Sequence, residues 1–536
     1  MTLIQAILIG IIYFLAISTF SGGVGFFTFN KPLIAGFFVG LILGDPCKGT
    51  EIGAAVNLLY IGNMSTGGTL PSDMTLAAIL AATLGISSGI SAEAVIALAV
   101  PVGLLGTLLW VGRLTIDTVF VQVAAQMIKK GKGGHLWIVN VLLPQTLLFV
   151  LSVFPLIIMV YWGMEYVQSG IYYLGNTFLN MMNIVGGMLP AVGLAMTLKS
   201  VFRGKAKVYF LIGFLLIQYL SLNTISVGII AVIFAVLAFQ NSEQKNKLMQ
   251  PIESEEQIYD KKLLNKKDLI RSCFIWEVQA QACYNYQNMQ GLGFAHAMVP
   301  IMKKLYGNDP ENFKKNLLKH MEFFNVAPQF AAMIPGLVVA LEEKKVLGNE
   351  QITDESIAAI KTSLMGPISG IGDTVIQGVL VPLLLSVFVG ISMNGNLAGP
   401  ILYGILITAI MLAINYYSFM FGYSKGSTAI LHFLQSGLIN KVVDVAMIMG
   451  CTVIGGLVAQ YVSIRVGIQI NVSDSIFDLQ KQLFDAVLPG ILPLVLTLLC
   501  YKCINKGVSI NRILLGILFI GVLGSISGIL VYEALQ

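Results

Sequence analysis

Hydrogen-bonding side chains stand inside apolar stretches of this sequence, where they are costly unless they bind a ligand or another part of the protein. In the first half they follow one another among glycines: Asp45, Glu51, Asn57, Asn63, Ser65, Thr66 and Asp73. In the second half the candidates are Gln281, Asn285, Gln290 and Asp373. Carboxylates and amides bind hydroxyl groups, and glycines let the backbone approach a compact ligand. These residues therefore suit a sugar-binding site.

The same candidates also have structural interpretations. Asp45 and Asp73 stand at expected helix ends beside a proline or glycine, where a carboxylate can cap the helix. Gln281, Asn285 and Asn288 are spaced i, i+4 and i+7, so we expect them to share one helix face. That face either contacts a sugar or forms a polar seam between helices.

The elements that hold these residues are predicted to be interrupted. In the second half, the apolar run 357–391 contains helix-breaking residues just before Asp373: Gly366, Pro367, Gly370 and Gly372. In the first half, the apolar runs 33–44 and 51–62 flank Gly44 and Pro46, and each is shorter than the roughly 20 residues that cross a bilayer. We therefore expect one broken or re-entrant element in each half, lining a cavity.

Composition indicates the class of protein. The 536-residue chain is 56% hydrophobic and 11% charged, with a mean hydropathy of +0.82, a balance that no soluble class has. We expect an all-α polytopic membrane protein whose first apolar segment is a membrane helix and not a cleaved signal. The net charge of +5 is small and its lysines cluster in loops, so no nucleic-acid partner is expected. The cysteines are scattered, and nothing in the sequence predicts a metal site or a cofactor.

The chain divides into two apolar halves joined by a polar middle. The expected parts are a membrane domain (1–240), a charged cytoplasmic linker (241–267), cytoplasmic helices (268–350) and a second membrane part (about 357–536), the last two forming one domain of 268–536. One cytoplasmic helix is predicted to begin after Asp309, with Pro310 in its first turn. Lysines near 129–132, 199–207 and 245–271 mark the cytoplasmic side.

Ordered motifs resemble a known family. In the second half they are Tyr284-Asn285-Tyr286, Asn288 to Phe294, Lys303 to Tyr306, His320 to Asn325, Met365-Gly366-Pro367 and Gly370 to Asp373. Over about 260–536 the chain thereby resembles the IID subunit of the mannose, fructose and sorbose family of bacterial sugar phosphotransferase systems (PTS). Residues 1 to about 240 are similar to the partner IIC subunit, through Lys31-Pro32-Leu33, Gly40 with Leu43-Gly44-Asp45, and Gly49 to Gly68 with Pro71 and Asp73. Two subunits are then joined in one chain.

This resemblance implies the translocator of a PTS permease. Such a protein binds an extracellular hexose or amino sugar and carries it inward, where a separate IIB protein, supplied by IIA, phosphorylates it. The chain would be the membrane part of a phosphotransferase complex with no catalytic residue of its own, since none of its four histidines matches a phosphorylated position. The resemblance also implies halves of inverted orientation, a homotrimer, and the bacterial cytoplasmic (inner) membrane.

The resemblance places sugar contacts at Asp45, Asn57, Asn63, Ser65, Asp73, Gln281, Asn285, Gln290 and Asp373. The chain departs from the family at two of them: many relatives have a glutamate where it has Asn57 and a tryptophan where it has Asn63. Losing a charge-assisted acceptor changes which sugar is preferred, so a preference for mannose does not follow.

Two other functions fit the same residues. An ion-coupled secondary sugar transporter would also use paired broken helices, with Asp45 and Asp373 binding Na⁺ or a proton and no phosphocarrier protein. A membrane receptor or scaffold would instead dock a cytoplasmic partner on the helix predicted within 309–325. Uptake of free sugar driven by an ion gradient distinguishes the first alternative from a PTS permease.

Overall fold

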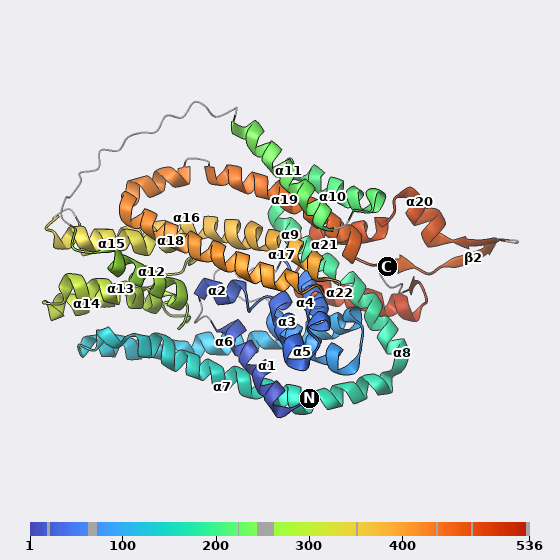
Figure 1. Ribbon diagram of the computed structural model, residues 1–536, viewed down its shortest axis with the longest axis horizontal. Helices are drawn as coiled ribbons and strands as arrows, with labels where there is room; N and C mark the ends of the chain where they lie inside the picture. The colour runs from blue at the N-terminus through green and yellow to red at the C-terminus, as the bar shows by residue number, and fades with distance from the viewer. Residues whose placement is uncertain are drawn as a thin grey trace.

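The computed structural model describes residues 1–18, 22–62, 72–222, 224–243, 262–349, 352–435, 438–472 and 475–531. The predicted site residues Asn63 and Ser65, and 244–261 of the expected linker, lie outside these ranges. The described chain is almost entirely helical, which confirms the predicted all-α class (Figure 1).

The helices of the first half are α1 (Leu3–Ile17), α2 (Gly22–Phe27), α3 (Pro32–Leu43), α4 (Pro46–Tyr60), α5 (Met74–Ser88), α6 (Ala92–Lys129), η2 (Gly133–His135), η3 (Ile138–Leu142), α7 (Leu143–Ile158), η4 (Met159–Gly163), α8 (Met164–Met188), α9 (Pro190–Val201), α10 (Ala206–Leu220) and α11 (Thr224–Glu243). Those of the second half are α12 (Lys266–Gln279), α13 (Gly291–Tyr306), α14 (Pro310–His320), η5 (Phe330–Ala332), α15 (Met333–Val346), α16 (Asp354–Gly372), η6 (Asp373–Leu380), α17 (Val381–Ser392), α18 (Ala398–Gln435), α19 (Leu438–Tyr461), η7 (Gln480–Phe484), α20 (Asp485–Val487), α21 (Ile491–Asn505) and α22 (Ile510–Ile526).

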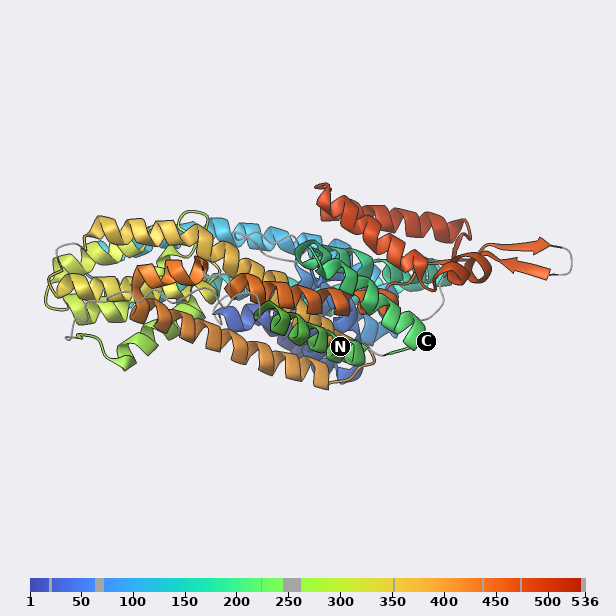
Figure 2. The same ribbon diagram turned by 90° about the horizontal axis from the view of Figure 1, so that it is seen from above.

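The few strands lie near the C-terminus. They are β1 (Arg465–Val466), β2 (Gln469–Val472), β3 (Ser475–Asp478) and β4 (Leu530–Val531). Strands β1 and β4 pair antiparallel, and so do β2 and β3. The β2–β3 hairpin protrudes from one end of the molecule, and helices α12 to α15 lie at the other end (Figures 1 and 2).

The break predicted in the first half is confirmed. Helix α3 ends where Gly44 takes a left-handed conformation (φ 89°), and α4 starts at Pro46. The two short helices pack so closely that a Cβ on Gly49 would lie only 2.4 Å from the Gly36 carbonyl oxygen. The glycines therefore allow α3 and α4 to form a tight helical hairpin.

The break predicted in the second half is wrong. Helix α16 continues through Gly366, Pro367, Gly370 and Gly372 into the π-helical segment η6 and then into α17. Proline removes one hydrogen bond but does not end this helix, and a Cβ on Gly366 or Gly370 would meet nothing within 4 Å. Gly372 serves close packing, since its Cβ would lie 2.7 Å from that of Ala327. The irregularity starts at Asp373, and π-helical segments occur often at functional sites.

Two long antiparallel helix pairs run along the long axis of the molecule. The turn between α6 and α7 lies at the left end of Figure 1, whereas the turn between α17 and α18 lies near its centre. The two pairs therefore point in opposite directions. This arrangement is what halves of inverted orientation would give.

The helices from α12 to α15 form one of the hydrophobic cores of the molecule, together with parts of α6, α16 and α18. Rings meet edge to face at its centre, with Phe294 4.9 Å from Phe324 and 5.8 Å from Trp276. Helix α14 begins as predicted, because the Asp309 carboxylate accepts from the Asn312 amide at 3.0 Å. Helices α13 and α15 are buried over most of their length.

Several described helices are long and apolar enough to cross a membrane. They are 133–163, 180–199, 354–392, 398–426 and 444–461, and a sixth would be the pair 480–487 and 491–505, which is bent by 64°. Large apolar side chains such as Phe154, Ile405 and Phe519 are more than half exposed on such helices or their neighbours. These surfaces suit contact with lipid, as expected of a multi-pass membrane protein.

Candidate functional site

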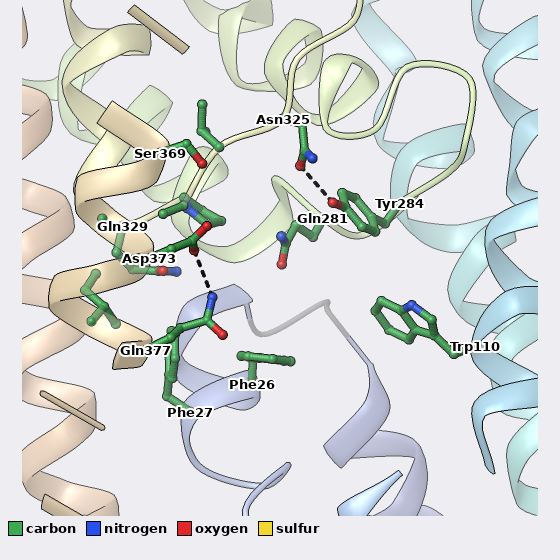
Figure 3. Close-up of a pocket in the computed structure, with 15 residues that line it drawn as sticks. Phe26, Phe27, Trp110, Gln281, Tyr284, Asn325, Gln329, Ser369, Asp373 and Gln377 are labelled. Atoms are coloured by element: carbon green, nitrogen blue, oxygen red, sulfur yellow. Dashed lines mark hydrogen bonds between the residues drawn. The ribbon is translucent and has the colours of Figure 1, made fainter. Parts of the chain in front are cut away.

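The main cavity lies between the two halves of the chain. Its volume is about 670 Å³, including the open space at its mouth. Its first-half residues are Phe26, Phe27 and Trp110; its second-half residues include Gln281, Tyr284, Asn325, Gln329, Ser369, Asp373 and Gln377 (Figure 3). A ligand in this cavity would contact both halves.

Polar side chains lie on two opposite sides of the cavity. The Gln377 amide donates to the Asp373 carboxylate at 2.9 Å, from the next turn of the π-helical segment. Opposite them, the Tyr284 hydroxyl donates to the Asn325 side-chain oxygen at 2.7 Å, and Gln281 extends between the two pairs (Figure 3). Among the described residues that line the cavity, Asp373 is the single charged one.

Aromatic rings form the other walls. The rings of Trp110 and Tyr284 are 6.3 Å apart and inclined at 45°, and Phe26 and Phe27 lie to the left of Trp110, beside Gln377, in Figure 3. Aromatic faces pack against the C–H faces of a ring, while amides and one carboxylate bind hydroxyl groups. The cavity therefore suits a small ligand rich in hydroxyl groups.

The loop that carries Gln281 and Tyr284 is not the helix that spacing predicted. Helix α12 ends at Gln279, and the Asn285 side-chain oxygen accepts from the amides of Gln287 and Asn288 at 3.1 and 2.8 Å. An asparagine that bonds its following backbone in this way favours a turn over a helix. Asn285 is thus buried in the loop and does not reach the cavity.

Gln290 acts behind the cavity wall. Its amide donates to the Val326 carbonyl at 2.8 Å and its oxygen accepts from the Val326 amide at 3.2 Å. These two bonds fix the segment that carries Asn325 and Gln329. Gln290 therefore positions the lining and does not line the cavity itself.

Side chains from the first half fix the position of the loop that carries Gln281 and Tyr284. Arg113 on α6 donates to the carbonyls of Ile17 (3.1 Å) and Ala282 (3.2 Å), and its Nε lies 3.4 Å from the Asp117 carboxylate. The Gln145 amide on α7 also donates to the Ala282 carbonyl at 2.8 Å. Sequence reasoning missed Arg113, although an Arg-x-x-x-Asp pair inside an apolar run is a signal of a buried ion pair.

A second, smaller cavity of about 310 Å³ adjoins the first. It is lined by Phe27, Lys31, Asn57 and Tyr60 from the first half and by Gln377, Val381 and Leu385 from the second, among others. The two cavities share Phe27 and Gln377. The predicted residue Asn57 thus lies at this second cavity, where its oxygen accepts from the Leu33 amide at 3.4 Å.

The two first-half carboxylates are helix caps. Exposed Asp45 accepts from the Lys48 amide at 2.9 Å at the start of α4. Buried Asp73 accepts from the Thr75 and Leu76 amides at 3.1 and 2.9 Å and from the Tyr13 hydroxyl at 2.6 Å. Neither lines the two cavities, so capping is the role that the structure gives them.

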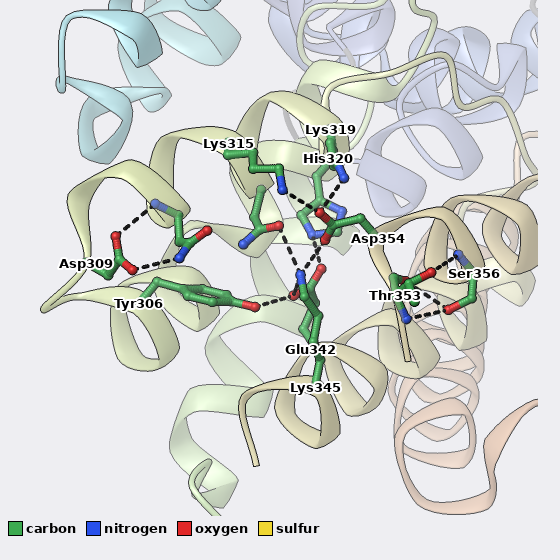
Figure 4. Close-up of polar contacts among 12 residues, drawn as sticks. Tyr306, Asp309, Lys315, Lys319, His320, Glu342, Lys345, Thr353, Asp354 and Ser356 are labelled. Atoms are coloured by element: carbon green, nitrogen blue, oxygen red, sulfur yellow. Dashed lines mark hydrogen bonds and ion pairs between the residues drawn. The ribbon is translucent and has the colours of Figure 1, made fainter. Parts of the chain in front are cut away.

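His296, His320 and the acidic and basic residues around His320 line neither of these two cavities. Burial lowers the pKa of His296 to about 4, and its Nδ1 lies 3.1 Å from the Asn140 amide nitrogen. His320 Nε2 lies 3.2 Å from Glu342 in a cluster where Asp354 also contacts Lys315, Lys319 and Lys345 (Figure 4). Among the described residues, no group of three or more His, Cys, Asp and Glu side chains is placed to hold a metal ion.

Comparisons with known proteins cover both halves. The pattern described as "PTS system mannose/fructose/sorbose family IID component" matches residues 263–530, and "PTS system sorbose-specific iic component" matches 3–237. The mannose-specific EIID component of Escherichia coli K12 is 35% identical over 50% of this chain and 96% of its own. The fructose permease IID component of Bacillus subtilis is 36% identical over 50% and 98%, and the E. coli K12 mannose-specific EIIC component is 31% identical over 41% and 84%.

Two solved structures are also similar. One, titled "Structure of membrane protein", is 34% identical and covers 50% of this chain and 99% of its own, with a TM-score of 0.47. The other is a mannose transporter ManYZ in complex with microcin E492, with the same identity and shares and a TM-score of 0.30. The matches to the two family patterns show that the chain belongs to the mannose/fructose/sorbose family of PTS membrane components, with a IIC region followed by a IID region in one polypeptide.

Proposed function

We propose that this protein is the membrane translocator of a PTS permease, which binds an extracellular hexose or amino sugar in the main cavity and carries it inward for phosphorylation by a separate IIB protein. The observation that carries this proposal is the cavity itself. Residues of the IIC and IID regions line it together, and they combine amides, one carboxylate and aromatic rings. The mannose-, fructose- and sorbose-specific names of the relatives agree with a sugar ligand.

Each lining group has a defined part in binding. The Asp373 carboxylate accepts from a sugar hydroxyl or from the ammonium of an amino sugar, and Gln377 holds it in place at 2.9 Å. Gln281 and Asn325 add hydrogen bonds of either polarity. Trp110 and Tyr284 pack against the ring face and exclude water from these bonds.

The phosphate comes from outside this chain in our proposal. His296 is buried and its pKa is lowered to about 4, and His320 is packed against Glu342, so neither is arranged as an accessible phosphocarrier. The IIB protein would then approach from the cytoplasmic side, which we place at the lysine-rich ends of the helices. The domain boundaries at 240 and 268, the homotrimer and the bacterial cytoplasmic membrane stay predictions of the same proposal.

Transport into vesicles tests the proposal. Right-side-out vesicles that carry the full chain are loaded with phosphorylated IIB and given labelled sugar outside. We expect sugar phosphate inside the vesicles, and little uptake when IIB is absent or unphosphorylated. Accumulation of free sugar driven by a Na⁺ or proton gradient, without IIB, would establish the ion-coupled alternative instead.

A further inference from the structure

Lys31 is a buried cation without an acid beside it. Its side chain is only 5% exposed, and its Nζ lies over the rings of Phe26 and Phe27, 5.2 and 5.8 Å from their centroids. Among the described residues, no ion pair or side-chain hydrogen bond is formed by this Nζ, and no carboxylate lies within 4.0 Å of it. The contacts of the ammonium with two ring faces contribute less free energy than its burial costs. The buried ammonium therefore lacks a neighbouring anion that would offset this cost.

The second cavity is where that anion fits. Among the described residues that line it, Lys31 is the single charged one, and the polar residues Asn57, Tyr60 and Gln377 are neutral. Asp373 belongs to the main cavity and forms no ion pair with Lys31. The site therefore combines one fixed positive charge with neutral hydrogen-bonding groups.

Asn57 explains why the charge is uncompensated. It lies on α4, on the wall of the same cavity, and its side chain is an amide that accepts from the Leu33 backbone. A glutamate at this position would bring a carboxylate to the cavity that Lys31 lines. This chain has the cation without that counter-charge.

We propose that Lys31 binds an anionic group of the transported sugar, so that this protein binds a monosaccharide bearing a carboxylate or a phosphoryl group more tightly than its neutral parent. The inference rests on the proposed function, because the sugar ring is placed in the main cavity. The two cavities share Phe27 and Gln377, so a substituent of a ring seated there extends toward Lys31. The anionic group is either the carboxylate of the substrate or the phosphoryl group that the sugar acquires, and both present anionic oxygens that an ammonium can bind.

Binding of three matched ligands tests this proposal on the purified full chain in lipid nanodiscs. The ligands are a neutral hexose, the corresponding uronic acid and the corresponding hexose 6-phosphate. We expect the wild type to bind one of the two anions at least about tenfold more tightly than the hexose, which is about 1.4 kcal/mol. Preference for the uronic acid identifies a substrate carboxylate, and preference for the phosphate alone identifies the phosphoryl group.

Four variants separate charge from packing. Lys31→Met and Asn57→Glu should remove the preference for the anion while hexose binding changes by less than about threefold. Lys31→Arg should keep the preference, and Lys48→Met, which removes a partly exposed lysine paired with Glu51 at 3.2 Å, should behave as the wild type. Equal affinity for all three ligands in the wild type, or a preference that survives Lys31→Met, would overturn the inference and leave the proposed function standing. Failure to bind any sugar would overturn both.

Discussion

The guanidinium of Arg113, on α6 in the IIC region, donates to the backbone carbonyl of Ala282 in the IID region at 3.2 Å. Trp110, three residues earlier on the same helix, lines the cavity. The centroid of its ring lies 5.6 Å from the Arg113 guanidinium carbon. The residue before Ala282 is Gln281, which lines the same cavity. One buried side chain thus links both sides of the candidate sugar site.

Replacing Arg113 by lysine should weaken sugar binding. Lysine keeps a charge near Asp117 but lacks the planar fork that reaches two carbonyls, so Gln281 and Trp110 lose their fixed positions. We expect the KM for sugar to rise about tenfold, equivalent to about 1.4 kcal/mol, with a smaller change in maximal uptake rate. Arg203→Lys, in the exposed loop between α9 and α10, is the control. A fall in maximal rate at constant KM would show that Arg113 acts elsewhere.

Two aspartates that sequence reasoning treated alike should behave differently. Asp373 lines the main cavity, so Asp373→Ala should abolish uptake, and Asp373→Asn should weaken binding about tenfold by removing the charge from the acceptor. Asp45 is an exposed cap, so Asp45→Ala should leave uptake near normal and lower stability by about 1 kcal/mol. Uptake assays and thermal unfolding of the same preparations measure both effects. Normal uptake by a folded Asp373→Ala protein would remove this residue from the site.

Glu277 on α12 should make stability depend on pH. Its side chain is 1% exposed, and burial raises its pKa to about 8. Below about pH 4.5 the carboxyl is protonated in both folded and unfolded chains. Between about 4.5 and 8 the unfolded chain alone releases the proton, so the folded state loses relative stability as the pH rises.

The variant Glu277→Gln removes this dependence. It should unfold at a temperature a few degrees above that of the wild type at pH 8, and the difference should shrink at pH 5. Glu355→Gln, at the exposed start of α16, serves as the control because its side chain is in water. Parallel melting curves for Glu277→Gln and the wild type across this pH range would contradict the assignment.

The close approach of α3 and α4 should be sensitive to a single methyl group. A Cβ on Gly49 would lie 2.4 Å from the Gly36 carbonyl oxygen and 2.6 Å from the Gly40 Cα, so Gly49→Ala forces the two backbones apart. We expect a loss of roughly 1 to 3 kcal/mol of stability, as for overpacked cores. Gly112→Ala on α6, where a Cβ meets nothing within 4 Å, should be neutral or slightly stabilising. Thermal unfolding in detergent compares the two variants.

Local sequence signals predicted local structure well. Gly44-Asp45-Pro46 combines a residue that adopts positive φ, a cap and a first-turn proline, and each acts within its own turn. Asp309 with Pro310 succeeded for the same reason. The prediction of a break at Gly366 to Gly372 failed because the helix is supported from outside: Gly372 packs on Ala327 and Phe330, contacts that local spacing does not reveal.

The candidate site was predicted only in part. Gln281 and Asp373 line the main cavity and Asn57 the second one, whereas Asn285, Gln290, Asp45 and Asp73 support the backbone. Polar residue types in apolar runs indicate that a role exists, but a carboxylate that caps and one that binds look the same in sequence. Trp110 and Lys31 line the cavities because the IIC and IID regions pack against each other. The spacing of residues within either region cannot show this packing.

The main cavity is complete only when the IIC and IID regions meet, and here a single polypeptide supplies both. Their ratio is therefore fixed at one to one. The two regions associate within one molecule, where their covalent connection sets a constant effective concentration. The fraction of chains in which they are associated therefore does not depend on how much of the protein the membrane contains. A cell that makes this chain needs no balance between the synthesis of two membrane partners, and every copy that folds carries a whole binding site.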